Sequence, residues 1–430
     1  MKTILITAYA LNPFKGSEDG MGWNFVRQAA KHHRVIAVTR KNNRIHIEKY
    51  LQQHPEIAQQ ANLITFYYFD WPAFLLQWKK GPLLSMIYFY AWQLTLALWL
   101  LKKRFAVDVV HNLNFHNNWT PTFLWLLGKP LVWGPVGHHP KIPANFLLPV
   151  YGKVAYLKDR SLWGMKNVFW KTDPFLHLSA RKSGQILCMH PEAAQKLHLH
   201  SGQYSILPSV ATEAPGNANT GIQAKKKFCI ISAGRFVPLK GFDITIRAFA
   251  RFYRNLQPEE QQQVSLMLVG SGPCLPLLQQ IIAQEQIGNA VQITEWLPRA
   301  ALQELYKQAS AFLFPSHEGA GMVVAEAMSY GLPVLCWNNC GPGRFLHPQS
   351  GLKVNYGTYE EGIKQFSENL LLLFRNKDFY LRETDLSTQR FKAHFDWNIR
   401  AGQLRRIYRF AYNAHYGITP AAATTPAPQF

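Results

Sequence analysis

The sequence predicts an α/β protein made of two Rossmann-like, doubly wound domains, and three observations lead to this prediction. Apolar strand-like runs alternate with helical stretches from one end of the chain to the other, which indicates parallel sheets with helices on both faces. The 430 residues suffice for two or three domains, and 48% of them are hydrophobic, enough for full cores. Residues 212–227, rich in Ala, Gly, Asn and Lys and without apolar periodicity, separate two sets of runs and are expected to be a linker.

The predicted strands follow in order along each domain. The first domain, 1–211, has apolar runs at 4–10, 35–40, 63–69, 107–112, 131–136, 186–189 and 206–207. The second domain, 228–395, has them at 228–233, 264–270, 291–294, 311–314 and 334–337. A basic helix is predicted near residues 398–412, and the Pro/Ala/Thr-rich tail 419–430 is expected to be disordered.

The net charge of +21 is unevenly spread. Residues 1–211 contain 24 lysines and arginines against 9 aspartates and glutamates. Such a basic half could meet nucleic acid, an anionic membrane or an acidic acceptor. Because no zinc finger, RNA-binding sheet motif or basic heptad region is present, we expect no nucleic acid and favour an anionic membrane surface.

Residues 81–101 form an uncharged stretch of 21 residues between lysine-rich flanks. About 20 apolar residues can span a bilayer, but strand-like runs lie on either side, and a span would put neighbouring strands on opposite sides of a membrane. We therefore expect a long crossover helix. Contact of its aromatic residues with the membrane interface stays open as an alternative.

The cysteines, the N-terminal residues and the absence of two motifs predict the compartment and the cofactor requirement. Its five cysteines are scattered and complete no metal-site spacing, so buried, reduced thiols in a cytoplasmic protein are expected. A strand begins at once at residue 4, so no signal peptide is expected. The G-x-G-x-x-G fingerprint of dinucleotide binding is absent, and no Asp-x-Asp follows a strand. We expect neither a cofactor nor a metal.

The segment from His317 to Met328 carries the most chemical information. It follows a buried strand-like run, its glycines mark a loop, and a helix is predicted from about residue 322 to 330. Ligands bind at the carboxyl edge of a parallel sheet, and helix N-terminal amides attract anions. Glu318 and Glu326 are therefore expected to face one crevice, where a carboxylate can accept two hydrogen bonds from a vicinal diol. Solvated or helix-capping glutamates are the alternative.

A second loop, after the strand-like run 228–233, carries Arg235 and Lys240. A guanidinium and an ammonium on one loop can clamp a diphosphate and neutralise charge on a departing one. Two unrelated surface cations are the alternative reading.

Taken together, these motifs resemble the nucleotide-binding half of family-4 glycosyltransferases, which are retaining enzymes of the GT-B fold. The resemblance rests on Gly-Arg followed by Lys-Gly at 234–241, Val-Gly-Ser-Gly-Pro at 269–273, Pro-Ser-His-Glu-Gly at 315–319 and Glu-Ala-Met at 326–328, in that order. It implies two domains facing a central cleft, with residues 396–415 packing back on the first. It further implies a nucleotide-diphosphate sugar as co-substrate.

The resemblance also implies roles for single residues. Glu326 matches the ribose-binding glutamate, Glu318 the residue facing the donor sugar, and Arg235 with Lys240 the diphosphate clamp. Further donor contacts are expected from Gly270, Leu297, Gly319, Ala320 and Gly321. Trp296 stands where a glycine is usual, beside the nucleobase.

The first domain is expected to add residues to this site. The loop 16–23, with three glycines, would aim a helix N-terminus at the donor, which makes Gly16 a donor-binding candidate. Glu18 and Asp19 there could bind acceptor hydroxyls or cap the helix. Relatives place a histidine after the strand-like run 131–136 to touch the donor sugar; His138 is the candidate, and His139 is its alternative. His111 ends another strand-like run.

The expected reaction is metal-independent transfer of a hexose to a glycan or lipid-linked acceptor in bacterial surface polysaccharide or lipopolysaccharide assembly. Glu318, Arg235, Lys240 and His138 are the catalytic candidates. A nucleotide-sugar epimerase of the same fold, a starch or glycogen synthase, and a non-catalytic basic protein that binds membrane or nucleic acid are the alternatives. The expected location is the cytoplasm, with the inner face of the plasma membrane as a peripheral site.

Overall fold

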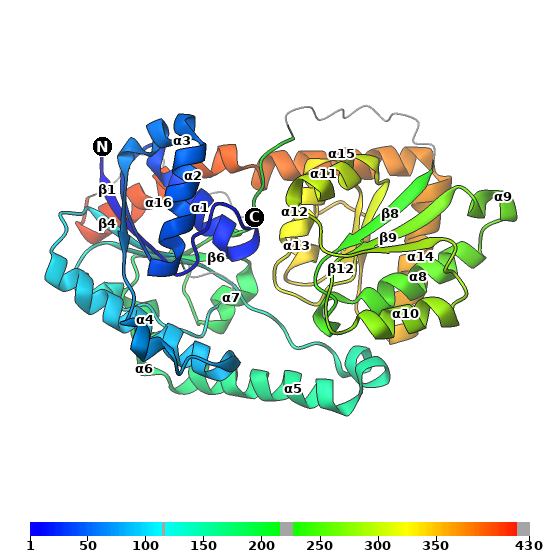
Figure 1. Cartoon of the computed structure of the whole chain (residues 1–430), viewed down its shortest axis with the longest axis horizontal. Coiled ribbons are helices and arrows are strands. Elements are labelled where there is room, and N and C mark those ends of the chain that lie inside the picture. Colours follow the sequence, from blue (N-terminus) through cyan, green and yellow to red (C-terminus); the bar gives the residue numbers. More distant parts are fainter. Residues whose placement is uncertain (114–116, 216–226, 419–430) are drawn as a thin grey trace. The chain divides into compact units, whose positions relative to one another are not determined.

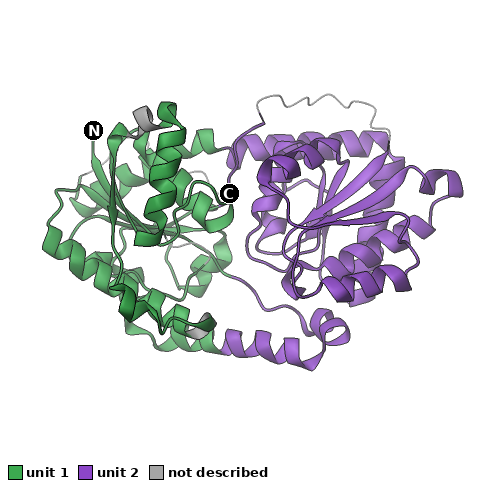
Figure 2. Ribbon diagram, viewed as in Figure 1, with its two compact units in different colours: residues 1–138, 165–209, 397–430 green, residues 139–164, 210–396 purple. Residues whose placement is uncertain are grey.

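The computed structural model describes residues 1–113, 117–215 and 227–418 of the chain. Packing divides the protein into two compact units, shown in Figure 2. The first comprises residues 1–138, 165–209 and 397–430, and the second comprises residues 139–164 and 210–396. Most of the predicted linker (216–226) and the predicted disordered tail (419–430) lie outside the described residues.

The first unit contains a seven-stranded parallel sheet with the order β3-β2-β1-β4-β5-β6-β7. Its strands β1, β4 and β6 are labelled in Figure 1. The strands are β1 (Thr3–Ala8), β2 (Arg34–Thr39), β3 (Ile64–Tyr68), β4 (Val109–Leu113), β5 (Leu131–Val136), β6 (Gln185–Cys188) and β7 (Tyr204–Ile206). Its helices are α1 (Ser17–Ala30), α2 (Arg44–Gln53), α3 (Pro55–Gln60), α4 (Gly81–Lys103), α6 (Pro174–Lys182), α7 (Pro191–Lys196) and α16 (Trp397–His415). Short 3-10 turns are η1 (Lys41–Asn43), η2 (Ala61–Leu63), η3 (Ala73–Leu76) and η4 (Leu124–Leu127).

Helix α4 is the crossover between β3 and β4 and covers one face of this sheet. Its residues Tyr88, Trp92 and Leu96 are buried against apolar side chains of β1, β2 and β4. The last helix of the chain, α16, packs against α1 and against β4, β5 and β6. His111 of β4 fixes this helix, because its Nδ1 lies 2.8 Å from the hydroxyl of Tyr408.

The second unit contains a six-stranded parallel sheet with the order β10-β9-β8-β11-β12-β13. The strands are β8 (Phe228–Ala233), β9 (Val264–Val269), β10 (Val291–Thr294), β11 (Ala311–Phe314), β12 (Val334–Trp337) and β13 (Lys353–Val354). The helical elements are η5 (Pro238–Lys240), α8 (Phe242–Arg254), α9 (Pro258–Gln261), α10 (Leu275–Gln284), α11 (Arg299–Gln308), α12 (Met322–Ser329), α13 (Pro342–Phe345), α14 (Tyr359–Arg375) and α15 (Lys377–His394). Among them, α8 packs against α10 and α14, and α12 packs against α15.

The observed strands confirm the predicted fold class, with one strand missed. Each predicted run contains or overlaps a strand, whereas β13 was not predicted because its two residues show no apolar periodicity. Helix α12 begins at the predicted residue, Met322.

Residues 139–164 precede the predicted boundary at residue 211, yet they pack with the second unit. They include most of α5 (Ala144–Thr172), which bends at Gly152. Apolar and polar contacts attach this segment. Phe146 packs against Trp337, with ring centroids 5.0 Å apart, and the Tyr151 hydroxyl donates a hydrogen bond of 2.6 Å to the buried Asp243 of α8.

One helix of the described chain is long and apolar enough to cross a membrane, with the candidate window at Leu84–Lys103 in α4. The strands on both sides of it, β3 and β4, belong to one sheet. A membrane-spanning α4 would separate those strands, so the sheet supports the crossover that the sequence predicted.

Candidate functional site

The site is built at the carboxyl edge of the second unit's sheet, where β8 and β11 lie side by side. The loop after β8 carries Arg235 and Lys240, and the loop after β11 carries Glu318. Two hydrogen bonds join the loops: the His317 amide donates to the carbonyl of Leu239 at 2.9 Å, and the Ser316 hydroxyl donates to the same carbonyl at 3.1 Å. Neighbouring parallel strands thus bring the two predicted motifs together.

Gly241 explains why a glycine follows Lys240. Its φ is +68°, a conformation that favours glycine. A Cβ at this position would lie 2.2 Å from the carbonyl oxygen of Pro315. Because the two backbones approach so closely, residue 241 must be a glycine. The same contact fixes the backbone position of the preceding residue, Lys240.

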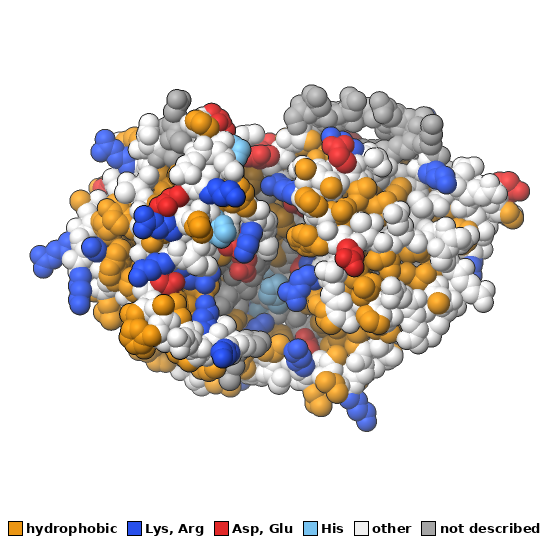
Figure 3. Space-filling model, in the orientation of Figure 1, with side chains coloured by type: hydrophobic (Ala, Val, Ile, Leu, Met, Phe, Trp, Pro, Cys, Tyr) orange, Lys and Arg blue, Asp and Glu red, His pale blue; other side chains and the backbone are white. Residues whose placement is uncertain are grey.

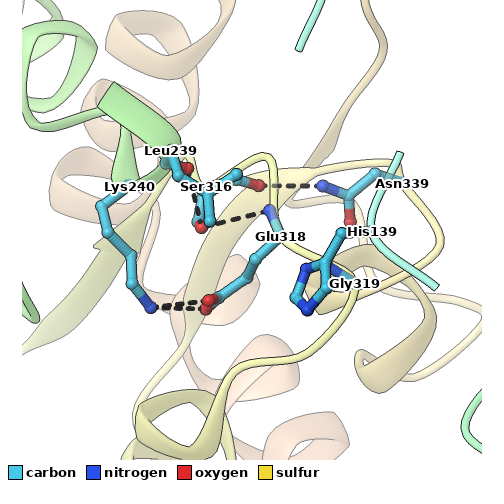
Figure 4. Close-up of polar contacts among 7 residues, drawn as sticks. All are labelled: His139, Leu239, Lys240, Ser316, Glu318, Gly319 and Asn339. Atoms are coloured by element: carbon cyan, nitrogen blue, oxygen red, sulfur yellow. Dashed lines mark hydrogen bonds and ion pairs between the residues drawn. The ribbon is translucent and has the colours of Figure 1, made fainter. Parts of the chain in front are cut away.

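Lys240 and Glu318 form a bidentate ion pair (Figure 4). The Lys240 Nζ lies 2.7 Å from each carboxylate oxygen of Glu318. The side chains are 18% and 10% exposed. From the sequence, Lys240 is expected at a diphosphate and Glu318 at a sugar, whereas in the structure the two side chains contact each other. Any anion that binds Lys240 must compete with this carboxylate.

A histidine contacts the Glu318 loop directly. The amide of Gly319 donates a hydrogen bond of 3.1 Å to Nδ1 of His139 (Figure 4). Because Nδ1 accepts here, the proton of a neutral ring is on Nε2. His139 belongs to the second unit, whereas the predicted candidate His138 belongs to the first.

His138 packs inside its own unit. Its ring centroid lies 5.2 Å from that of Trp170, and its carbonyl oxygen lies 3.1 Å from Nε2 of His190. Burial, and next the nearby His190, lower the pKa of His138 to about 4, so the ring is neutral near pH 7. Of the two histidines, the structure brings His139 to the Glu318 loop, a choice that the sequence left open.

Asn339, which is not among the predicted site residues, supports the Glu318 loop by hydrogen bonds. Its side-chain amide donates a hydrogen bond of 2.8 Å to the carbonyl of Ser316. Its Oδ1 accepts from the amides of Gly341 and Gly343 at 3.1 and 3.2 Å. The available signal was its position just after β12 and two residues before the Gly-Pro-Gly run at 341–343.

His317 lies beside Glu318 in sequence but points into a stack of aromatic rings. Its ring lies 5.7 Å from Tyr356 and 6.0 Å from Trp337, centroid to centroid. Its Nδ1 is 2.9 Å from the Tyr356 hydroxyl. Burial lowers the pKa of His317 to about 3, so this residue supports the loop as a neutral side chain.

Arg235 and Gly270 lie at the ends of adjacent strands. The side chain of Arg235 is exposed at the loop after β8. Gly270 follows β9 with a φ of +152°, and a Cβ there would lie 1.9 Å from the carbonyl oxygen of Gly234. Gly270 is thus required for packing of the two loops, whatever it binds.

Glu326 faces a different partner from Glu318. It lies in α12, and its Oε1 is 3.8 Å from Nε of Arg299 at the start of α11. Its side chain is 16% exposed. Burial raises the pKa of Glu326, and the charge of Arg299 opposes that rise. Between β10 and α11, Leu297 is half-buried and Trp296 is 73% exposed.

The N-terminus of α12 completes this edge of the sheet. Gly319, Ala320 and Gly321 are buried and lead directly into the helix at Met322. The first amides of a helix have no partner within the helix and attract anions. The predicted amide-rich loop is therefore present beside the Lys240–Glu318 pair.

The predicted residues of the first unit lie at the start of α1 and within strand β4. Gly16 is exposed and precedes α1, and a Cβ there would meet no atom within 4 Å. Glu18 and Asp19 lie in the first turn of α1, and the N-cap position of this helix is Gly16. His111 is fully buried, and its Nε2 lies 2.8 Å from the carbonyl of Gly134, so it is a packing residue. Within the described ranges, no group of three or more His, Cys, Asp or Glu side chains could hold a metal ion.

Part of this chain is similar in sequence to known proteins. A family model described as glycosyl transferases group 1 matches residues 218–380. A GDP-mannose-dependent alpha-(1-6)-phosphatidylinositol monomannoside mannosyltransferase of Mycolicibacterium smegmatis is 29% identical over 33% of this chain and 38% of its own length. The chain spans half or less of the length of the first curated relatives that it matches.

Solved structures extend the likeness to both units. Anabaena HepE in complex with UDP and glucose has a TM-score of 0.57 at 14% identity, covering 95% of this chain and all of that one. WaaG, a glycosyltransferase involved in lipopolysaccharide biosynthesis, has a TM-score of 0.56 at 16% identity, covering 97% of this chain and all of that one. At such identities the likeness concerns the fold alone. The solved structures thus show a GT-B type fold over both units, and residues 218–380 of the second unit are similar to the group 1 glycosyl transferases.

Proposed function

We propose that this protein is a retaining, metal-independent glycosyltransferase that moves a hexose from a nucleotide-diphosphate sugar to a glycan or lipid-linked acceptor. The observation that carries the proposal is the Lys240–Glu318 pair beside the α12 N-terminus. A cation, a row of helix amides and a carboxylate within one loop pair are suited to a diphosphate joined to a sugar.

Donor binding would exchange partners at this pair. A diphosphate carries more negative charge than Glu318, so it would take Lys240 as its own counterion, with Arg235 as the second cation. Glu318 would then accept hydrogen bonds from sugar hydroxyl groups. Glu326, 16% exposed and paired with Arg299, would hold the ribose diol.

In the transfer step, the acceptor oxygen forms a bond to the anomeric carbon while the bond from that carbon to the phosphate oxygen breaks. The bonding electron pair leaves with the nucleoside diphosphate, and the acceptor's hydroxyl proton goes to the departing phosphate oxygen. Lys240, Arg235 and the α12 amides would stabilise the charge that develops on this leaving group. Retention of configuration is inferred from the resemblance to family 4.

The acceptor class is inferred from the relatives. The mannosyltransferase is named for a phosphatidylinositol-linked acceptor and WaaG for lipopolysaccharide biosynthesis. We accordingly propose a role in bacterial surface polysaccharide synthesis, carried out in the cytoplasm at the inner face of the membrane.

The test uses the full chain and a panel of UDP-, GDP- and ADP-hexoses, with slow donor hydrolysis as the readout. One donor should release its nucleoside diphosphate, and Lys240→Met should reduce this release at least 100-fold. Lys364→Met is the matched control, because Lys364 pairs with Glu368 in an exposed contact on α14. A ligand at 100 times its Kd should also raise the free energy of unfolding by about 2.7 kcal/mol. If no donor is hydrolysed and none stabilises the protein, the proposal is wrong.

A nucleotide-sugar epimerase is the second candidate, because the same loops would serve it. An epimerase interconverts sugars without an acceptor. Release of nucleoside diphosphate that rises when an oligosaccharide or lipid-linked acceptor is added supports transfer, whereas epimerised sugar formed without acceptor supports the alternative.

A further inference from the structure

The outer face of α4 carries a row of exposed apolar residues. The exposed fractions are 36% for Leu84, 49% for Ile87, 37% for Leu94, 47% for Leu98 and 40% for Leu101. Spacings of three, four and seven residues put side chains on one face of a helix. From Leu84 to Leu101 the row is about 25 Å long, at 1.5 Å per residue. The opposite face of α4 already packs on the sheet, so this row is a second apolar face on one helix.

Two neighbouring segments of the same unit widen this row into a surface. On one side, Trp71 donates a hydrogen bond of 2.8 Å to Thr95 of α4 and so attaches the segment that contains η3. On the other side, the Tyr90 hydroxyl lies 3.0 Å from Asp173, the residue that caps α6. These segments add further exposed apolar side chains: Phe74, Leu75, Trp78, Val168 and Phe175. Figure 1 shows α6 next to α4, in agreement with these contacts.

Cations stand at both ends of the row, and no acid stands within it. Lys80 precedes the helix, and Lys102, Lys103 and Arg104 follow the row; all are exposed. Helix α4 itself contains no aspartate or glutamate. The nearest acids in the attached segments, Asp70 and Asp173, are engaged by the hydroxyls of Tyr88 and Tyr90. On the face drawn in Figure 3, hydrophobic side chains gather over this part of the first unit with lysines and arginines beside them.

We infer that this surface, the α4 row with the apolar residues of η3, α5 and α6 beside it, lies flat on an anionic lipid bilayer. Leucines and aromatic rings would enter the boundary of the acyl chains, and the lysines at both ends would meet lipid phosphates. A protein partner would need a long apolar surface with acidic residues only at its two ends. A bilayer offers an apolar layer with negative charge along its surface, which matches the whole pattern. The inference does not depend on the proposed transfer reaction.

The experiment is co-sedimentation of the full chain with vesicles of phosphatidylglycerol and phosphatidylethanolamine. Vesicles of phosphatidylcholine alone are the uncharged comparison. We expect binding to the anionic vesicles that weakens as salt rises, because screening reduces attraction between surface charges. Binding to the uncharged vesicles should be at least tenfold weaker.

Variants separate the apolar and the charged contributions. Leu94→Gln together with Leu98→Gln should weaken vesicle binding about tenfold or more, while Leu372→Gln, at a residue 40% exposed on α14, should change it less than twofold. Lys102→Glu with Lys103→Glu should weaken it more than tenfold, since each lysine contributes about fivefold. Thermal unfolding and nucleotide binding checked on each variant show whether the fold is intact.

Three outcomes would overturn the inference. The first is equal binding of all variants. The second is resistance of the bound protein to extraction by alkaline carbonate, which would show a spanning helix. The third is a dimer in sedimentation velocity that the two leucine substitutions dissociate, with no binding to vesicles; the row would then be covered by a second copy of the chain.

Discussion

The Lys240–Glu318 pair gives the sharpest test of the site, because its energy can be estimated from the distances. At 2.7 Å and an effective dielectric constant of about 20, the Coulomb attraction is about 6 kcal/mol. Desolvation of two largely covered charges cancels much of it. Replacing Lys240 by Met leaves Glu318 without its counterion, and we expect a loss of about 2–3 kcal/mol in the free energy of unfolding.

A double-mutant cycle measures the pair itself. Lys240→Met should lower the melting temperature of the second unit by about 5–10 °C, since 1 kcal/mol corresponds to about 2–4 °C in a domain of this size. Glu318→Gln in the Lys240→Met background should restore part of the loss, because it removes the unpaired charge. The coupling energy should be about 2 kcal/mol. The same cycle on Lys364 and Glu368 should give less than about 0.5 kcal/mol, as expected for an exposed pair. Equal couplings in the two cycles would refute the reasoning.

Three further predictions concern the frame of the site and of the first unit. Gly241→Ala should lower the free energy of unfolding by more than about 2 kcal/mol, because its Cβ would meet the Pro315 carbonyl. Gly202→Ala, also at a positive φ but in open space, should lower it by about 1 kcal/mol. Urea unfolding measures both losses, and similar values would argue against the contact. Burial lowers the pKa of His111 from 6.5 to about 4. As pH falls, the unfolded chain therefore takes up this proton before the folded protein does. Between pH 6.5 and 4 the free energy of unfolding of the wild type should fall by about 3 kcal/mol, a loss that His111→Gln should not show. Burial raises the pKa of Glu326, so the folded state holds this proton longer than the unfolded chain. The stability of the wild type relative to Glu326→Gln should therefore fall as pH rises above the ordinary value of 4.5. A flat difference across pH in either titration would contradict the assigned burial.

The sequence predicted the fold because its signals are local. Buried parallel strands appear as short apolar runs, and helices α8 and α12 begin where glycines end the preceding loops. The strand β13 escaped prediction, since two residues carry no period. The packing of the segment 139–164 with the second unit does not follow from the sequence for a related reason: its attachment depends on contacts of Phe146 and Tyr151 with residues far along the chain.

The candidate site was predicted in its composition but not in its pairings. Spacing placed Lys240, Glu318 and the Gly319–Gly321 loop at one sheet edge, and the structure has them there. Neither the choice of His139 over His138 nor the contact of Arg299 with Glu326 follows from spacing. Asn339 was also missed, since its importance comes from three backbone groups that surround it.

By itself, the sequence determined that this chain folds into two parallel sheets and which loops carry cations, carboxylates and glycines, because periodicity and turn residues act over a few neighbours. Only the tertiary structure decided that Lys240 holds Glu318, that His139 reaches the same loop, and that the outer leucines of α4 remain uncovered. Each of these depends on the direction of side chains across segments separated by tens of residues, and sequence spacing does not encode that direction.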